Sequence, residues 1–375
     1  MINALAGVEI GTQLHWKEID RVNKPRFFFV NKMENENVKW RNTLTSIKDA
    51  FGKNAVAVQI PIGEAENFKG IIDLLHMKAY EFDSNGERKE IDIPADLKDD
   101  SEAEREALIE VAAEADDQLL EKYFEEGTLD DADVLKGFQS GIINSTVFPI
   151  LFGSGGKNMG VRVLLDFVDE YCPAPNQTGI VKAYKTGTED VVELNNDSSA
   201  KPVGFVYKLV NEGHLGEMSF IRSFNGEVKA STDLKNQQKD ATERIGQLYT
   251  FQGKNRIEIP SVVAGDIGVL VKLKDTHVGN TLCDGSLSVS VPPVDFTNPV
   301  MDVAIKSAKK GDEDKVAGGL TKLHEEDPTF KLVADPALKQ QVLYGQGPTH
   351  IDVLVAKLKS RFGVEVELVK PKIPY

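Results

Sequence analysis

The stretch Phe27-Phe28-Phe29-Val30-Asn31-Lys32-Met33-Glu34 places four apolar residues directly before a loop that is mostly polar. A short, wholly apolar run is typical of a strand buried on both faces, as in parallel sheets. A second run of this kind, residues 147–152, leads into Gly153-Ser154-Gly155. The carboxyl ends of parallel strands meet at one edge of a sheet, where open α/β sheets bind ligands. The sequence therefore predicts an α/β domain in which two loops converge on one site.

These loops have the chemistry to recognise one purine base. The carboxylate of Glu34 can accept two parallel hydrogen bonds from the N1–H and exocyclic amine of guanine, and a backbone N–H after Ser154 can donate to the guanine carbonyl oxygen. Adenine presents the opposite donors and acceptors, and would leave buried groups unpaired at a cost of about 1 to 3 kcal/mol each. A loop rich in Asn and Lys is also common on protein surfaces, so the prediction depends on the second loop.

Helices and strands alternate around the two loops. The predicted elements are helices at residues 9–23, 38–51 and 161–168 and a further strand at residues 55–60. In the first helix the apolar positions are Leu14, Ile19 and Val22, and the second helix ends at Gly52. This alternation supports the α/β class for the first 175 residues.

An acidic insertion interrupts the α/β pattern. Residues 81–140 contain 21 acidic and 6 basic residues, a difference of −15, so the rest of the chain has 38 of each. We predict a hairpin turn at Asn85-Gly86 and one amphipathic helix at about residues 101–124. Five acidic side chains recur along it at helical spacing without interleaved lysines: Glu106, Glu110, Glu114, Asp117 and Glu121. They form either a solvated face or a docking stripe for a basic partner.

The chain becomes rich in β-structure after Pro175. Alternating strands are predicted at residues 203–210, 217–224, 257–259 and 269–273, which favours a closed or nearly closed β-barrel. From residue 299 onward the predicted order is strand, helix, strand, strand, helix, strand, the ferredoxin-like order. The expected organisation is a partial nucleotide-binding domain at 1–175 with its insertion at about 57–147, a barrel at 176–297 and a ferredoxin-like domain at 298–375.

Composition excludes several other classes. The formal net charge of −15 argues against a protein that coats nucleic acid, DNA included, non-specifically. The longest apolar runs fall far short of the roughly 20 residues of a membrane span, and no secretory signal is visible, so a cytoplasmic location is expected. Two cysteines, Cys172 and Cys283, and six scattered histidines show no metal-ligand spacing. We assign no metal ligand and no catalytic residue.

Several stretches resemble the elongation factor G family of translational GTPases. Asn31-Lys32-Met33-Glu34 resembles the Asn-Lys-x-Asp guanine motif, and Gly153-Ser154-Gly155 is similar to its Ser-Ala companion loop. Further similar stretches, in the same order, are Gln59-Ile60-Pro61-Ile62-Gly63, Phe68-Lys69-Gly70-Ile71-Ile72-Asp73, Glu325-Glu326-Asp327-Pro328-Thr329-Phe330 and Tyr344-Gly345-Gln346-Gly347. The resemblance implies guanine contacts from Asn31, Lys32, Glu34, Ser154 and Gly155.

The sequence departs from the family pattern at several places. Its 375 residues contain no Gly-x-x-x-x-Gly-Lys-Ser/Thr phosphate loop and no Asp-x-x-Gly-His segment, and the family's fourth and fifth domains have no counterpart. Glu34 stands where the family has Asp, and Gly347-Pro348-Thr349-His350 where it has Gly-Glu-Leu-His. We expect a truncated form of a longer GTPase, inactive alone and without tightly bound nucleotide.

The resemblance implies that the whole protein binds GTP or GDP with Mg²⁺, hydrolyses GTP and promotes translocation on the ribosome. Ribosomal RNA and the ribosomal stalk protein are the implied partners, and the acidic insertion is the implied stalk contact. Peptide release factor three and the ribosomal protection proteins are related alternatives. A ribosome-docking module that has lost its nucleotide switch is an alternative of a different class, because the phosphate loop is missing from the sequence.

Overall fold

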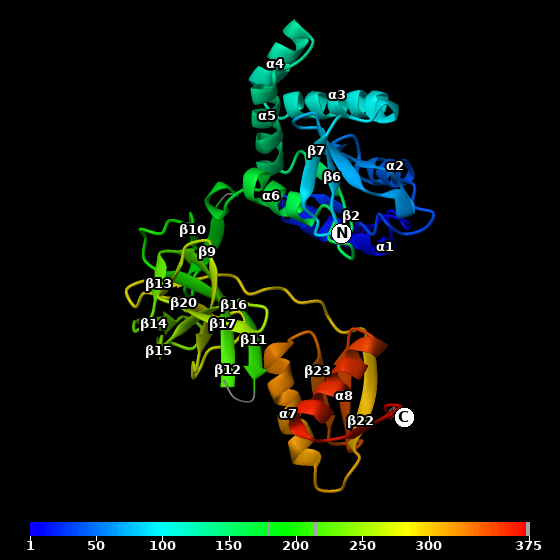
Figure 1. Ribbon diagram of the computed structural model, residues 1–375. Helices are drawn as coiled ribbons and strands as arrows, with labels where there is room; N and C mark the ends of the chain where they lie inside the picture. The colour runs from blue at the N-terminus through cyan, green and yellow to red at the C-terminus, as the bar shows by residue number, and fades with distance from the viewer. Residues whose placement is uncertain (179, 213–215, 373–375) are drawn as a thin grey trace. The chain divides into compact units, whose positions relative to one another are not determined.

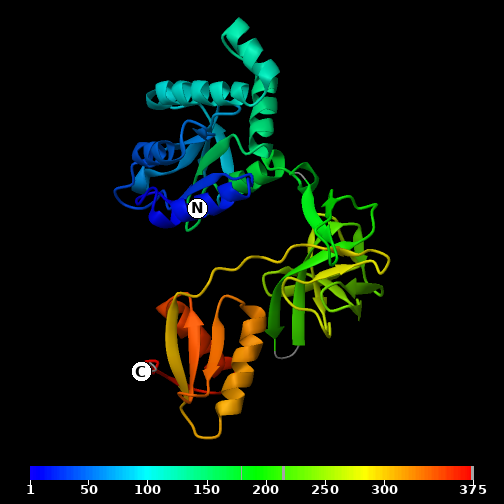
Figure 2. The ribbon, with the colours of Figure 1, turned by 180° about the vertical axis from the view of Figure 1, so that it is seen from behind.

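The computed structural model describes residues 1–178, 180–212 and 216–372, arranged in two compact units, residues 1–178 and 179–375. Figures 1 and 2 show the chain from opposite sides. The α/β class of the first unit, the β-barrel and the ferredoxin-like domain are all confirmed.

A parallel sheet forms the centre of the first unit, with strand order β1-β2-β8-β3. Its strands are β1 (Ile2–Asn3), β2 (Phe28–Asn31), β3 (Ala55–Ala57) and β8 (Phe148–Phe152). The accompanying helices are α1 (Ile10–Arg21), α2 (Trp40–Phe51) and α6 (Val161–Tyr171). Every residue of β3 and β8 is buried, as the apolar runs predicted.

Helix α1 packs through a residue that the apolar spacing did not single out. It contains no fully buried residue, and Leu14 is 58% exposed. Trp16 instead lies against the core, stacked on Phe28 with ring centroids 5.5 Å apart and tilted against Phe51 with centroids 4.3 Å apart. The helix predicted from Leu14, Ile19 and Val22 is therefore present, but one large aromatic ring covers the sheet while Leu14 and Val22 stay exposed.

The insertion begins with an antiparallel sheet of strand order β4-β5-β6-β7. Its strands are β4 (Gln59–Ile62), β5 (Gly70–Asp73), β6 (Lys78–Phe82) and β7 (Arg88–Ile91). The single strand expected at residues 55–60 is divided at Val58, and its two parts pair in different sheets. Gly86 turns the β6–β7 hairpin with φ +78°, as the Asn-Gly signal predicted.

Three helices follow the sheet where one was expected. They are α3 (Lys98–Glu114), α4 (Asp117–Glu126) and α5 (Asp131–Ile143), and Figure 1 shows α4 extending away from α3. The predicted helix 101–124 is broken because the Asp116 carboxylate accepts hydrogen bonds from the N–H groups of Gln118 and Leu119 and so caps a new helix. Helix α5 was not predicted. Short 3₁₀ turns occur at Ala65–Asn67, Ala95–Leu97 and Pro175–Gln177.

The barrel of the second unit is built on an antiparallel sheet of order β15-β14-β20-β11-β12-β19-β16-β17, with smaller sheets β10-β9-β21 and β13-β18. Irregular pairing between the two long strands β11 and β12 bends the sheet. The strands are β9 (Val181–Lys185), β10 (Val191–Leu194), β11 (Val203–Glu212), β12 (Gly216–Asn225), β13 (Glu227–Lys229), β14 (Asp233–Asn236), β15 (Ala241–Arg244), β16 (Leu248–Gln252), β17 (Asn255–Ile259), β18 (Ser261–Val263), β19 (Ile267–Val271), β20 (Thr281–Cys283) and β21 (Val289–Ser290).

The ferredoxin-like part has the predicted element order and the sheet order β23-β24-β22-β25. Its elements are β22 (Met301–Ser307), α7 (Glu313–Glu326), β23 (Lys331–Asp335), β24 (Gln340–Gly345), α8 (Pro348–Phe362) and β25 (Val366–Val369). Side chains of α7 and α8 share one core with Ile305 and Leu343 of the sheet. Pro348 begins α8, a position where its missing N–H costs nothing.

Candidate functional site

The two predicted loops meet at the carboxyl ends of β2 and β8. Val30 pairs with Phe152 in the parallel register, and the Gly153 N–H donates to the Val30 carbonyl at 2.9 Å. The Met33 N–H donates in turn to the Gly153 carbonyl at 3.3 Å, and the Met33 side chain is fully buried. Backbone hydrogen bonds and a buried anchor therefore fix the two loops against each other.

Asn31 joins the loops through its side chain. Its Oδ1 accepts a hydrogen bond from the Gly155 N–H at 2.8 Å. The sequence assigned that N–H to the base, whereas in the structure it positions Asn31. The Asn31 Nδ2 group donates to no described residue and stays available as a donor.

Ser154 holds the shape of the second loop. Its side chain is fully buried, and its Oγ accepts a hydrogen bond from the Lys157 N–H at 3.1 Å. Its backbone pairs both ways with Met159, at 2.9 and 3.0 Å. The Ser154 side chain is thus committed to the loop, and the turn it closes presents the N–H groups that follow it.

Glu34 lies beside the second loop. A Cβ built on Gly156 would come within 3.2 Å of the Glu34 Oε1, so the carboxylate and the Gly156 backbone are neighbours. The Glu34 Oε2 atom is buried and accepts no hydrogen bond from any described residue. A buried carboxylate oxygen without a donor is costly and uncommon. This orphaned acceptor fits the two donors on the Watson–Crick edge of guanine.

Two further residues complete the loops. Lys32 adopts a left-handed conformation with φ +65° and is exposed, with no ion pair among the described residues. The Asn158 Nδ2 donates to the Asn85 carbonyl of the β6–β7 hairpin at 3.0 Å. A side chain at Gly86 would collide with the Asn158 carbonyl at 2.2 Å. The hairpin therefore packs on the second loop, a contact that sequence reasoning missed because the two segments are 73 residues apart.

The acidic residues of the insertion do not form one stripe. Glu106, Glu110 and Glu114 lie on α3, whereas Asp117 and Glu121 lie on α4. No lysine is interleaved among them, but the Lys53 ammonium group, from outside the insertion, forms an ion pair with the Glu114 carboxylate. That hydrogen bond raises the pKa of Lys53, and the nearby charge of Glu110 adds to the effect.

Metal clusters and membrane spans are both absent from the described residues. No group of three or more His, Cys, Asp or Glu side chains could hold a metal ion within residues 1–178, 180–212 and 216–372. In the same part of the chain, every helix is too short or too polar to cross a bilayer.

Comparisons with known proteins match the whole chain in order. The model of the elongation factor Tu GTP binding domain matches residues 1–174, that of elongation factor Tu domain 2 matches residues 216–283, and that of elongation factor G domain III matches residues 296–370. A crystal structure of a Thermus thermophilus protein aligns with all of this chain and 53% of its own, with a TM-score of 0.85 and 27% identity.

A curated relative gives the same result. Elongation factor G of Mycoplasma pneumoniae is 36% identical over 378 residues, an alignment that covers 100% of this chain and 55% of the relative. The chain therefore spans about half the length of the relatives it matches. The three successive domain matches and the identity along the whole chain show that the chain is a homologue of elongation factor G.

Proposed function

We propose that the loops after β2 and β8 bind the guanine base of GTP or GDP. Glu34 accepts hydrogen bonds from the N1–H and the exocyclic amine, and Asn31 donates from its Nδ2 group. The Gly156 N–H donates to no described residue and lies beside Glu34, so it is the donor we assign to the guanine carbonyl oxygen. Gly155 and Ser154 act by positioning Asn31 and the turn, and the Lys32 side chain covers the base.

The observation that supports this assignment most directly is the orphaned Glu34 oxygen. A surface glutamate would have both oxygens in water, whereas the Oε2 atom of the half-buried Glu34 is covered, next to a turn with a free N–H. Guanine would supply the missing donors, and adenine would place an acceptor against the same oxygen. The site therefore favours guanine for two reasons. Guanine forms hydrogen bonds with it, and adenine would leave buried groups unpaired.

Homology to elongation factor G supports a wider proposal for the whole protein. We infer that it binds GTP with Mg²⁺, hydrolyses GTP and promotes translocation on the ribosome in the cytoplasm. We assign no residue of this chain to the phosphates or to Mg²⁺, because phosphoryl transfer relies on a phosphate loop that the sequence lacks. The described residues supply the part that recognises the base. The boundaries that we propose between the three domains are 175/176 and 297/298.

Variants of Glu34 test the guanine site. Ligand-observed NMR titration with GDP should rank Glu34→Asp above the native chain and the native chain above Glu34→Ala. The aspartate carboxylate is set back by about one C–C bond, roughly 1.5 Å, and relieves the crowding by the extra methylene. Glu36→Ala is a matched control, because Glu36 is exposed two residues further along the same loop. Equal GDP affinity in all these chains would remove Glu34 from the pocket.

We propose that the acidic helices α3 and α4 contact the basic stalk protein of the ribosome. Glu106, Glu110 and Glu121 are exposed and form no ion pair among the described residues, so their charge is available to a partner. Changing these three to Gln should weaken stalk-protein binding and flatten its salt dependence. The control changes Glu104 and Glu114, which already pair with Lys48 and Lys53. Unchanged binding at low salt in the triple variant would favour a solvated face.

A further inference from the structure

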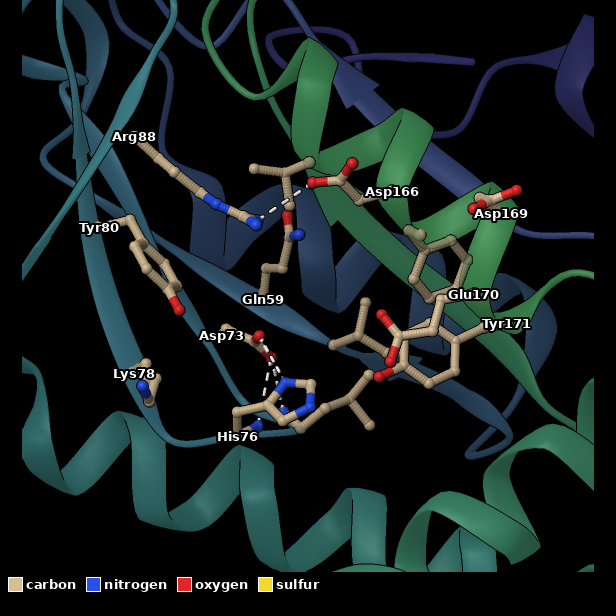
Figure 3. A pocket seen from close by; sticks show the side chains of 14 residues that line it. Gln59, Asp73, His76, Lys78, Tyr80, Arg88, Asp166, Asp169, Glu170 and Tyr171 are labelled. Atoms are coloured by element: carbon tan, nitrogen blue, oxygen red, sulfur yellow. Dashed lines mark hydrogen bonds and ion pairs between the residues drawn. The ribbon is translucent and has the colours of Figure 1, made fainter.

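A half-open cavity of about 610 Å³ lies within the first unit, away from the two loops. Strands β4, β5 and β6 form one wall and helix α6 forms the other (Figure 3). Its apolar surface comes from buried side chains that include Val58, Leu75 and Phe167. The cavity thus offers an aliphatic floor between two polar walls.

Each cationic group on the wall already has a carboxylate partner. The Arg88 guanidinium pairs with Asp166 at 3.3 Å, and the Lys78 ammonium pairs with Glu90 at 3.1 Å. The His76 Nδ1 lies 2.8 Å from the Asp73 carboxylate, whose other oxygen accepts from the backbone. Among the described residues, no basic side chain that lines the cavity is therefore left without a carboxylate partner.

Two carboxylates are left over. Asp169 and Glu170, at the carboxyl end of α6, line the cavity and form no ion pair among the described residues. Glu170 lies beside the Tyr171 hydroxyl, and burial together with this carboxylate raises the pKa of Tyr171. The hydroxyl consequently keeps its proton, and the unpaired charge in the cavity is negative. The end of a helix adds to that negative potential.

One buried polar group that lines the cavity lacks a partner. Tyr171 is 6% exposed, and its hydroxyl oxygen is buried without a partner of hydrogen-bond geometry among the described residues. Gln59 on the opposite wall is 4% exposed, and its Oε1 accepts a hydrogen bond from the Phe152 N–H at 3.5 Å. Buried polar groups are normally satisfied, so the unpaired phenol indicates a missing ligand.

We propose that this cavity binds an aliphatic diamine or polyamine. An ammonium group at one end pairs with Glu170, which lies beside the Tyr171 hydroxyl in Figure 3, and donates to the Tyr171 oxygen. The charge of Asp169 adds to the attraction, and the methylene chain covers Val58, Leu75 and Phe167. A divalent metal fits poorly, because no group of three or more potential ligands converges among the described residues. The proposal is independent of guanine binding, since it uses none of the residues in the two loops.

Calorimetric titration of the 375-residue chain with putrescine and with spermidine, at constant ionic strength, tests the proposal. We expect saturable binding at one site, and no binding of butanediol, the uncharged analogue of putrescine. Glu170→Gln should weaken binding about tenfold and Tyr171→Phe about fivefold, the losses typical of a charge-assisted and a neutral hydrogen bond. Glu125→Gln, which removes an exposed carboxylate of α4, should leave the affinity unchanged.

Three results would overturn the proposal. The first is absence of binding, and the second is equal weakening by Glu170→Gln and Glu125→Gln, which would mean that the amine joins only the general counter-ion atmosphere. The third is full displacement by Mg²⁺ at the same ionic strength. Glu170 is exposed, so its substitution tests the proposal even if Tyr171→Phe fails to fold, which circular dichroism would reveal.

Discussion

At the scale of single residues, the proposed guanine contact of Glu34 comes with a cost in stability. Its buried Oε2 has no donor in the described chain, so the folded state bears an unsatisfied carboxylate oxygen. Glu34→Gln removes the charge and should raise the free energy of unfolding by about 1 kcal/mol, measured by urea denaturation. The same change should abolish the guanine preference, because the side-chain amide of Gln would place an N–H donor against the N–H donors of guanine. A less stable Glu34→Gln variant would show that the carboxylate is satisfied after all.

Two variants of Asn31 can separate its hydrogen bond to the Gly155 N–H from its proposed contact with the base. Asn31→Asp keeps an oxygen for the Gly155 N–H and loses the Nδ2 donor, so it should keep the stability of the native chain and bind GDP more weakly. Asn31→Ala loses both and should also lower the free energy of unfolding by about 1 kcal/mol. Urea denaturation and ligand-observed NMR, run on both variants, check this. Equal stability of the two variants would contradict the role of the Gly155 hydrogen bond.

Residue identities in the site could be predicted from sequence, but their partners could not. The motif identified Asn31, Glu34 and Ser154 as neighbours, because strand ends in a parallel sheet share one edge. A difference of one residue in the turn decides which backbone N–H donates to Asn31 and which stays free for the proposed contact with the base. Likewise, apolar spacing favoured Leu14, while ring size made Trp16 the packing residue. Spacing describes the direction of a side chain and says little about its reach.

At the scale of elements, a buried arginine connects three segments of the insertion. Arg105 of α3 donates to the Leu74 and Leu75 carbonyls at 2.6 and 2.8 Å, and to Asp131 of α5 at 2.8 Å. Arg105→Met should lower the free energy of unfolding by about 3 kcal/mol, because it leaves two carbonyls without donors. Arg21→Met, at an exposed arginine of α1, is the control. If Arg105→Met lowered the free energy of unfolding by no more than the control does, in urea denaturation, this role would be contradicted.

The junction of α4 and α5 should respond to acid. Asp130 caps α5 by accepting from the Asp133 N–H, and this hydrogen bond, together with Lys122, lowers the pKa of Asp130. A lowered pKa means that the stabilisation is complete above the ordinary value of 3.8 and is lost as the pH falls through the lower folded value. Asp130→Asn should flatten this part of the pH profile, as followed by amide exchange in α5. An unchanged profile would exclude the cap as its source.

Helix existence was easier to predict than helix ends. The run of acidic residues from 101 to 124 keeps helical spacing across Asp116, so nothing in its periodicity marks the break. Asp is a good N-cap, however, and the local hydrogen bonds to Gln118 and Leu119 outweigh continuation of α3. Similarly, Val58 is as apolar as the three residues before it, and only tertiary pairing assigns β3 and β4 to different sheets.

At the scale of the whole molecule, the two units have separate hydrophobic cores. The core of residues 1–178 is distinct from those of the barrel and the ferredoxin-like part. Chains built in this way do not unfold in a single cooperative step. Scanning calorimetry should give a van't Hoff enthalpy smaller than the calorimetric enthalpy. Equality of the two enthalpies would mean that all the cores unfold together.

The family match and the missing phosphate loop together define what the chain can do alone. A few hydrogen bonds to the base, worth about 1 kcal/mol net each, do not offset the cost of immobilising a nucleotide. We therefore expect weak binding of GDP and no hydrolysis of GTP, even with ribosomes present. Turnover in a phosphate-release assay would reveal a phosphate site outside the known pattern.

The central claim, that these residues recognise guanine and nothing beyond the base and its sugar, is tested most directly by comparing GDP with ADP. Ligand-observed NMR on the native chain, with Mg²⁺ present, should show GDP binding in the millimolar range, roughly the affinity of a few hydrogen bonds, and weaker or no ADP binding. Equal responses to the two nucleotides, or micromolar affinity for GDP, would contradict the claim.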